Sequence, residues 1–218
     1  MTKLITLSFL LICISSVTYG QIKKGSILLG GQVFYFDSKF VQSTNQIVQK
    51  NSTATFNISV GKAFKENSLY GLNLSYSPSA YDYAYNGSTY LNRKTKFYSI
   101  GGYYRLYKSL AKDFYFFSEL GAAYIFSHQI DTDTLGIKQV PLNQSGGQLN
   151  FTPGISYKIF KRVNFEVTIP NIVYVQYSVS KTETATPSQY TKENRFSLNT
   201  NLNSSPLNYL GIGFRIIL

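Results

Sequence analysis

The chain has 218 residues, with 21 Lys and Arg against 10 Asp and Glu, and a formal net charge of +11. This length suits one domain, and a single cysteine, Cys13, excludes disulfides and thiolate metal sites from the rest of the chain. The basic residues are scattered and several lie at predicted turns, which is a weak pattern for nucleic-acid binding. Basic segments beside an anionic lipid surface explain the charge more simply.

Residues 1–20 have the parts of a secretory signal peptide. Lys3 gives a positive start, 4–14 form an apolar run too short to cross a bilayer as a helix, and 18–20 end on small residues. We therefore expect cleavage before Gln21 and a single domain over 21–218. The alternative interpretation of this segment is an N-terminal membrane anchor.

Beyond the leader, eight segments alternate apolar residues with polar or small ones. A period of two is typical of a β-strand whose two faces meet different surroundings. The composition agrees, because 19 Tyr and 16 Phe occur with only 14% charged residues, as in membrane barrels with aromatic girdles. In chain order, the predicted strands cover 27–35, 54–61, 70–77, 98–106, 114–126, 149–159, 164–177 and 208–218.

The closing segment, 208–218, shows the pattern most clearly. One face is apolar throughout, at Leu210, Ile212, Phe214, Ile216 and Leu218. The other face carries two glycines and a charge, at Gly211, Gly213 and Arg215. In a soluble protein such an edge strand would leave a long hydrophobic edge exposed. A transmembrane barrel instead gives the apolar face lipid and pairs the strand with the first one.

Short and long connections alternate between the predicted strands. Three are short turns, at 65–68, 108–113 and 161–162, and four are long polar loops, at 37–51, 79–94, 127–146 and 178–194. This asymmetry predicts short turns and both termini in the periplasm, with the loops outside. Residues 195–207 also alternate, and they either extend the eighth strand across Ser205 and Pro206 or form an extra strand.

The predicted fold class is all-β, an eight-stranded antiparallel transmembrane β-barrel preceded by a cleaved signal peptide. A lipocalin-like soluble barrel would show charge on its outer face, whereas here the second face is mostly Gly, Ser, Thr and Asn. Those residues pack well in a narrow lumen. Eight strands leave a lumen that side chains can fill, so we expect no open aqueous channel.

The whole of 21–218 resembles the small outer-membrane β-barrel proteins of Bacteroidota (PorT-like), which share the architecture of OmpA- and OmpX-type barrels. The resemblance rests on the opening strand Lys24–Gly31 (KGSILLGG), the cleavage site before Gln21 and the closing strand 210–215 (LGIGFR). It implies an outer-membrane location. It also implies contact with outer-membrane lipids and lipopolysaccharide, and some relatives are linked to protein secretion machinery.

Five charged residues fall on the predicted inner face: Arg105, Glu119, Lys158, Glu166 and Arg215. We interpret them as a structural network of lumen charges, because an unpaired buried charge is very costly. Lys158 and Glu166 flank the 161–162 turn and are the best candidates for a cross-strand pair. The alternative is an ion-binding site or a gated passage.

Two further groups lie in the predicted outer loops. Tyr81, Tyr83, Tyr85 and Tyr90 form either a surface recognition patch or part of the outer aromatic girdle. His128, near Asp131 and Asp133, could serve a rim enzyme as a general base, or the two carboxylates a cation. No nucleophile motif, phosphate loop, nucleotide fingerprint or zinc spacing accompanies them, so no catalytic, cofactor or metal site is predicted.

The sequence therefore predicts a non-enzymatic integral outer-membrane protein. Its role would be structural or would lie in surface interaction through four long extracellular loops, with an extracellular or secretion-machinery protein as a possible partner and no nucleic acid. Two alternatives remain open, a narrow pore for small solutes and a rim-located enzyme that hydrolyses lipid or protein.

Overall fold

The computed structural model describes residues 22–42, 47–85, 88–133, 135–137, 141–183, 190–200 and 210–218. Within these ranges the strands are β1 (Ile27–Gln42), β2 (Ile47–Lys65), β3 (Ser68–Tyr85), β4 (Ser88–Ala111), β5 (Phe114–Asp133), β6 (Leu142–Phe160), β7 (Val163–Thr168), β8 (Val173–Glu183), β9 (Tyr190–Thr200) and β10 (Gly211–Ile217). No helix in this described part is long and apolar enough to cross a membrane. The predicted signal peptide, 1–20, lies outside the described residues.

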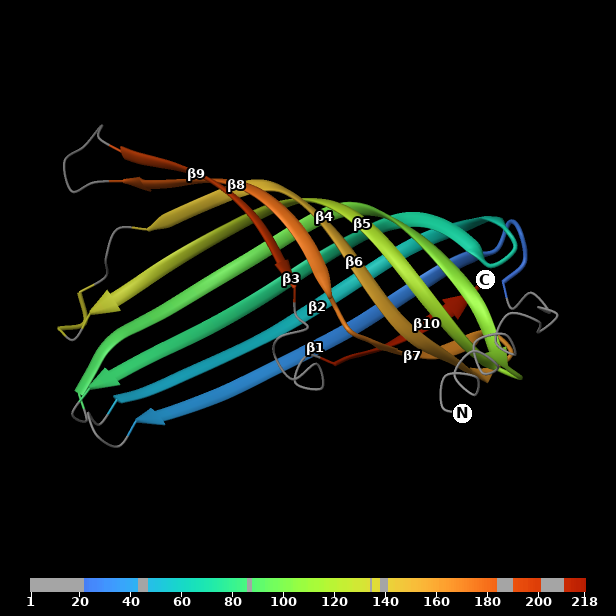
Figure 1. Ribbon diagram of the computed structural model, residues 1–218, viewed down its shortest axis with the longest axis horizontal. Helices are drawn as coiled ribbons and strands as arrows, with labels where there is room; N and C mark the ends of the chain where they lie inside the picture. The colour runs from blue at the N-terminus through green and yellow to red at the C-terminus, as the bar shows by residue number, and fades with distance from the viewer. Residues whose placement is uncertain are drawn as a thin grey trace, which may run out of the picture.

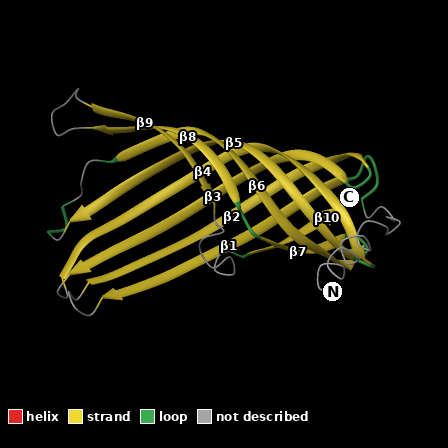
Figure 2. Cartoon of the chain, viewed as in Figure 1, coloured by secondary structure: helices red, strands yellow, loops and turns green. Residues whose placement is uncertain are grey.

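Eight strands close into a ring, in the order β1, β2, β3, β4, β5, β6, β7 and β10. Every neighbouring pair is antiparallel, and the ring closes where β10 pairs with β1 from Leu28 opposite Ile217 to Phe34 opposite Gly211. Figure 1 shows the tilted strands wrapped around one axis, and Figure 2 shows that the described fold is made of strands and short connections. The predicted eight-stranded antiparallel barrel is confirmed.

Two strands, β7 and then β8, pair one after the other along the length of β6, and β10 and β9 lie beside them. β7 pairs with β6 as far as Thr168 opposite Gly154, and β8 takes over at Val173 opposite Phe151. Between them the backbone passes through Asn171, whose φ is 50°. β9 then pairs with β8 as β10 pairs with β7. Residues 195–200 belong to β9, whose only partner among the described strands is β8. The rest of 195–207, with Ser205 and Pro206, lies outside the described residues, so the choice between an extended eighth strand and an extra strand stays a prediction.

The two faces of the wall match the predicted alternation. Outward side chains are apolar and exposed, with Ile58 at 69% and Leu72 at 62% of their full surface. Inward residues one position away along the strands are half-buried or buried, and Arg105 is 1% exposed. The barrel therefore carries its apolar surface outside and its polar groups inside, the reverse of a soluble globular protein.

The predicted long loops are wrong over most of their length. Segments 37–51, 79–94, 127–146 and 178–194 are largely strand, and the strand bounds leave only 43–46, 86–87, 134–141 and 184–189 between successive strands. The pairing register continues without a break from Val33 opposite Phe56 to Gln42 opposite Ile47. Hydrophobic alternation reports what each face touches, whereas backbone pairing continues in water with polar side chains on both faces.

The three predicted short turns are confirmed and lie at one end of the barrel, here called the turn end (Figure 1). Asn67 and Asp113 occupy two of these turns with φ of 57° and 62°, a left-handed conformation that Asn and Asp adopt more readily than most residues. The C-terminal Leu218 exchanges two backbone hydrogen bonds with Ile27 at this end. The opposite end, where the strand extensions lie, is called the far end.

Candidate functional site

The lumen is filled at the turn end by a cluster of buried apolar and aromatic side chains. Ile22, which precedes β1, is fully buried in it, and its backbone exchanges hydrogen bonds with Asn67. The other members come from β1 to β5: Leu28, Ala63, Leu69, Tyr103, Tyr107, Tyr115 and Phe117. This cluster forms a hydrophobic layer across the barrel, and charged groups lie directly against it.

Arg105, on β4, links two acidic residues. Its Nε donates a hydrogen bond of 2.7 Å to Oε2 of Glu119, its cross-strand neighbour on β5. Its Nη1 donates to both carboxylate oxygens of Glu166, on β7, at 2.9 and 2.8 Å. The guanidinium also lies over the ring of Phe117, with Cζ 4.1 Å from the ring centroid, a cation–π contact with the apolar layer.

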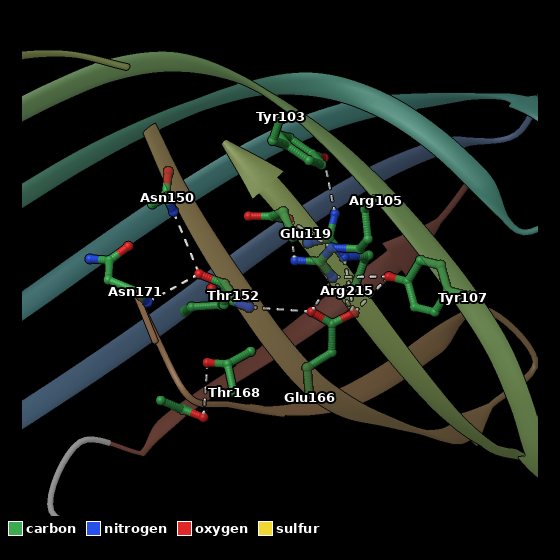
Figure 3. Close-up of polar contacts among 12 residues, drawn as sticks. Tyr103, Arg105, Tyr107, Glu119, Asn150, Thr152, Glu166, Thr168, Asn171 and Arg215 are labelled. Atoms are coloured by element: carbon green, nitrogen blue, oxygen red, sulfur yellow. Dashed lines mark hydrogen bonds and ion pairs between the residues drawn. The ribbon is translucent and has the colours of Figure 1, made fainter. Parts of the chain in front are cut away.

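Glu166 is the centre of the network and is 1% exposed. Arg215 on β10 donates from Nε to its Oε1 at 3.1 Å, and the Tyr107 hydroxyl donates to the same oxygen at 2.9 Å. Gln32 on β1 donates to Oε2 at 3.3 Å. Arg215 also donates from Nη1 to the Tyr103 hydroxyl at 3.2 Å. Figure 3 shows Tyr103, Tyr107, Glu166 and Arg215 meeting in the lumen from strands that lie apart in the sequence.

The charges of this network balance. Two guanidinium groups, from Arg105 and Arg215, meet two carboxylates, from Glu119 and Glu166, in three ion pairs, of which the two to Glu166 are buried and the one to Glu119 is partly buried. Buried ions are tolerated when each is paired and its remaining hydrogen-bonding positions are used. The structure thus brings together four of the five predicted lumen charges.

Lys158 does not belong to this network, and the predicted Lys158–Glu166 pair is wrong. The register between β6 and β7 places Lys158 opposite Asn164 and Glu166 opposite Ser156. The cause is the short turn at 161–162, where the register shifts between Lys158 and Phe160. Lys158 is half-exposed, and none of the ion pairs within the described residues includes it.

Sequence reasoning missed the neutral members of the network, Gln32, Tyr103 and Tyr107. All three lie on inward positions of their strands, so the alternation that located the charges could have located them as well. The missing information was the stagger of the strands. Glu166 and Tyr107 are 59 positions apart in the chain, and the closed ring places them at the same height.

On the far-end side of the network the lumen contains a cavity of about 460 Å³. Gln32, Glu119 and Thr152 line it next to the network, and its walls carry mainly amide and hydroxyl groups, among them Asn57, Asn73, Asn150, Gln148 and Gln176. Cavity, charge network and apolar cluster therefore follow one another along the barrel axis. The last two fill the lumen towards the turn end.

The predicted grouping of His128 with Asp131 and Asp133 does not form. These residues lie in β5, not in a loop, and strand alternation places His128 and Asp131 on opposite faces. His128 Nδ1 lies 2.7 Å from Asn143 Oδ1. Asp131 accepts two hydrogen bonds from Arg93, at 2.9 and 2.8 Å, and the Asp133 carboxylate accepts from the backbone of Leu135 and Ile137.

The predicted tyrosine patch lies on strand extensions. Tyr81, Tyr83 and Tyr85 belong to β3 and Tyr90 to β4. Alternation along β3 puts the first three on the face of Ser77, which lines the lumen cavity, and not on the outward face of Tyr76. The girdle interpretation therefore fails for these three residues. They continue the inner wall at the far end.

Comparison with known proteins finds similarity to solved structures. No protein-family model matches the chain, and no curated protein matches it. Among solved structures, Neisserial surface protein A (NspA) is 14% identical with a TM-score of 0.43, over 88% of this chain and 97% of that one. The outer membrane protein OprG from Pseudomonas aeruginosa is 14% identical with a TM-score of 0.45, over 90% and 97%. A major outer membrane protein from Thermus thermophilus is 10% identical with a TM-score of 0.46, over 88% and 99%.

Proposed function

We propose that this protein is a non-enzymatic, integral outer-membrane β-barrel with a closed lumen, whose far end is a surface-interaction region. The observation that carries the proposal is the continuous outward belt of exposed apolar side chains around a closed ring of strands. Ile58, Leu72, Ile100 and Leu120 are each 56–69% exposed at the middle of this belt. Apolar surface of this extent in water would cause aggregation, whereas lipid solvates it.

Aromatic side chains on the outer face border the belt on both sides. Towards the turn end, the Phe64 ring centroid lies 5.8 Å from that of Tyr70 and 5.9 Å from that of Tyr104. Towards the far end, the Tyr98 ring lies 5.1 Å from Tyr76 and 6.5 Å from Phe126. Two aromatic bands separated by aliphatic residues are typical of barrels whose rings lie at the two membrane–water interfaces.

The closed lumen favours a structural or interaction role over the narrow pore. A solute entering the cavity from the far end meets the charge network and then the apolar cluster. Both would have to be displaced, and opening the network would leave buried charges unpaired. His128 does not support a catalytic site at the rim. Its Nδ1 lies close to the amide oxygen of Asn143, and the side chain is on the opposite face of β5 from Asp131.

The far end supplies the surface for a partner. The outer parts of long paired strand extensions, such as 180–182 of β8 and 191–195 of β9, carry polar side chains, whereas Tyr177, Phe196 and Leu198 nearer the belt are exposed and apolar. In the proposed orientation this end is extracellular and the turn end, with both termini, is periplasmic. A protein partner would therefore meet the faces of paired strands, in place of the long polar loops that the sequence predicts.

Cell fractionation tests the proposal. We expect the protein in the outer-membrane fraction, resistant to alkaline extraction and released only by detergent. Recovery as a soluble periplasmic monomer would overturn the membrane assignment. Planar-bilayer recording separates the closed barrel from the pore, since reproducible single-channel steps would show that the lumen conducts. An unchanged lipid A mass spectrum in a deletion strain is expected for a protein that does not deacylate lipid.

A further inference from the structure

A groove crosses the outer face of β2, β3, β4 and β5. It encloses about 430 Å³, and its walls are the outward side chains Phe56, Ile58, Leu74, Ile100, Tyr124 and Phe126. The groove lies within the apolar belt. A hydrocarbon chain is the ligand that such walls accept, because the transfer of each methylene from water to an apolar surface is favourable. Apart from Ser75, Ser99 and the tyrosine hydroxyls, the lining is aliphatic and aromatic.

The groove ends at the far-end aromatic band. Tyr76 and Tyr98 belong to its lining, and their rings are 5.1 Å apart across β3 and β4. Tyrosine rings at this level combine an apolar body with a hydroxyl that remains at the water boundary. The boundary between hydrocarbon and headgroup therefore lies at one end of the groove.

Two lysines follow at the headgroup level. On β4 the outward positions beyond Tyr98 are Lys96 and Lys94, and both are exposed. Their cross-strand neighbours on β3 are Pro78 and Ala80, and those on β5 are His128 and Ile130. None of these neighbours is acidic, and no ion pair of Lys94 or Lys96 occurs within the described residues. On the same face Asp82 lies one outward position beyond Ala80, where it is opposite Lys50 and accepts a hydrogen bond from Asn92. Two adjacent positive charges therefore project beside the groove with no carboxylate directly opposite either of them.

We propose that the groove and the two lysines form a binding site for a phosphate-bearing lipid of the outer leaflet. One acyl chain lies in the groove, and the phosphate lies against the ammonium groups of Lys94 and Lys96. The site rests on the proposed function, because it requires the belt to be in a membrane with the far end at the outer surface. The lipid completes the site by supplying the negative charge that is absent from the positions opposite the two lysines.

Other outward lysines do not combine these features. Lys108 lies on the same strand and the same face, but at the turn end and away from the groove. Lys39 faces Lys50 across β1 and β2, yet Lys50 also faces Asp82 on β3. The groove, the aromatic band and two cations without an acidic residue directly opposite them coincide at Lys94 and Lys96.

The test uses the full-length mature barrel, purified in detergent and observed by native mass spectrometry. The probes are lipid A with two phosphates and the same lipid with both phosphates removed. The measured quantity, here called retention, is the fraction of barrel that keeps a bound lipid. We expect this fraction to be at least about tenfold higher for the phosphorylated lipid, because each lysine near an anionic headgroup raises the affinity roughly fivefold. In Lys94→Gln/Lys96→Gln, retention of the phosphorylated lipid should fall about tenfold or more, to the level of the dephosphorylated probe.

Two matched variants separate this site from general effects. Lys108→Gln removes a lysine from the same face of β4 and should leave retention unchanged. Ile100→Trp fills the groove and should weaken both lipids, whereas Leu120→Trp, on the belt outside the groove, should not. Equal retention by the parent and Lys94→Gln/Lys96→Gln, or equal loss in Lys108→Gln, would overturn the site. If the protein still fractionates with the outer membrane, such a result refutes the lipid site alone and leaves the proposed function standing.

Discussion

Glu166 has more partners than any other charged side chain in the lumen network. It accepts hydrogen bonds from Arg105, Arg215, Tyr107 and Gln32, which come from β4, β10 and β1. Both arginines are 1% exposed. If the Glu166 carboxylate were lost, water could not reach either buried guanidinium group. Glu166 therefore determines whether the positive charges of Arg105 and Arg215 remain neutralised.

Replacing Glu166 with Ala should destabilise the folded barrel by about 3–5 kcal/mol, because two buried guanidinium groups lose a shared counter-ion. Urea unfolding of the variant in detergent, followed by circular dichroism, measures the change. Glu193→Ala is the matched control. Its ion pair with Arg195 is 59–66% exposed, so its removal should leave the unfolding midpoint unchanged. Equal midpoints for Glu166→Ala and the parent would refute the buried network.

At the scale of elements, the ring depends on close approach of β1 and β10. Gly213 lies opposite Gln32, and a Cβ atom added to it would be 2.5 Å from the carbonyl oxygen of Gly31 and 2.5 Å from Cγ of Gln32. These contacts are shorter than van der Waals contact, and one involves the backbone, which cannot rotate away. A side chain at position 213 therefore disturbs the pairing of β1 with β10, the seam that closes the barrel.

Gly213→Ala should lower the stability of the closed barrel by about 1–3 kcal/mol through this overpacking. The folded fraction can be measured by the shift in gel mobility between unheated and heated samples in SDS. Gly31→Ala is the control, because a Cβ at this outward position has no atom within 4 Å. An equal fall of the folded fraction in both variants would contradict the view that close approach of β1 and β10 at Gly213 holds the barrel closed.

The strand extensions at the far end allow a second prediction at this scale. Val41 and Val48 are opposite each other in the extension of β1 and β2. The chain has no cysteine other than Cys13, so Val41→Cys/Val48→Cys should form a single disulfide on mild oxidation. Val41→Cys/Gln49→Cys should not, because residue 49 points to the opposite face. Equal oxidation of both pairs would contradict the paired strands and indicate the polar loop that the sequence predicts over 37–51.

The elements that sequence reasoning predicted well are those whose two faces meet different environments. At 54–61, Ile58 faces the outside and Asn57 the lumen, so the alternation was readable from the residues. Around Lys39 and Lys50 neither face of the strands is consistently apolar, so the alternation disappears from the sequence although the strands remain paired. The Arg105–Glu166 contact joins residues 61 positions apart. It depends on strand stagger, which the residue pattern does not specify.

At the scale of the whole molecule, the barrel is organised in layers along its axis. An apolar cluster lies at the turn end, the neutral charge network covers it, and a polar cavity of about 460 Å³ follows. Outside, aromatic bands enclose an aliphatic belt, and lysines lie beyond the far-end band. The apolar cluster and the charge network close the lumen, and the outer aromatic bands and aliphatic belt match a bilayer. Both assignments require the apolar outer face of the wall to meet lipid.

Lipid quenching of single tryptophans tests this central claim most directly. The chain contains no Trp, so Ile58→Trp and Asn57→Trp each introduce one probe, on opposite faces of the same strand. In bilayers containing brominated acyl chains, we predict strong quenching of the fluorescence of Ile58→Trp and little quenching of Asn57→Trp. Quenching confined to Asn57→Trp, equal quenching of both probes, or no quenching of either would contradict a barrel whose apolar outer face meets the membrane.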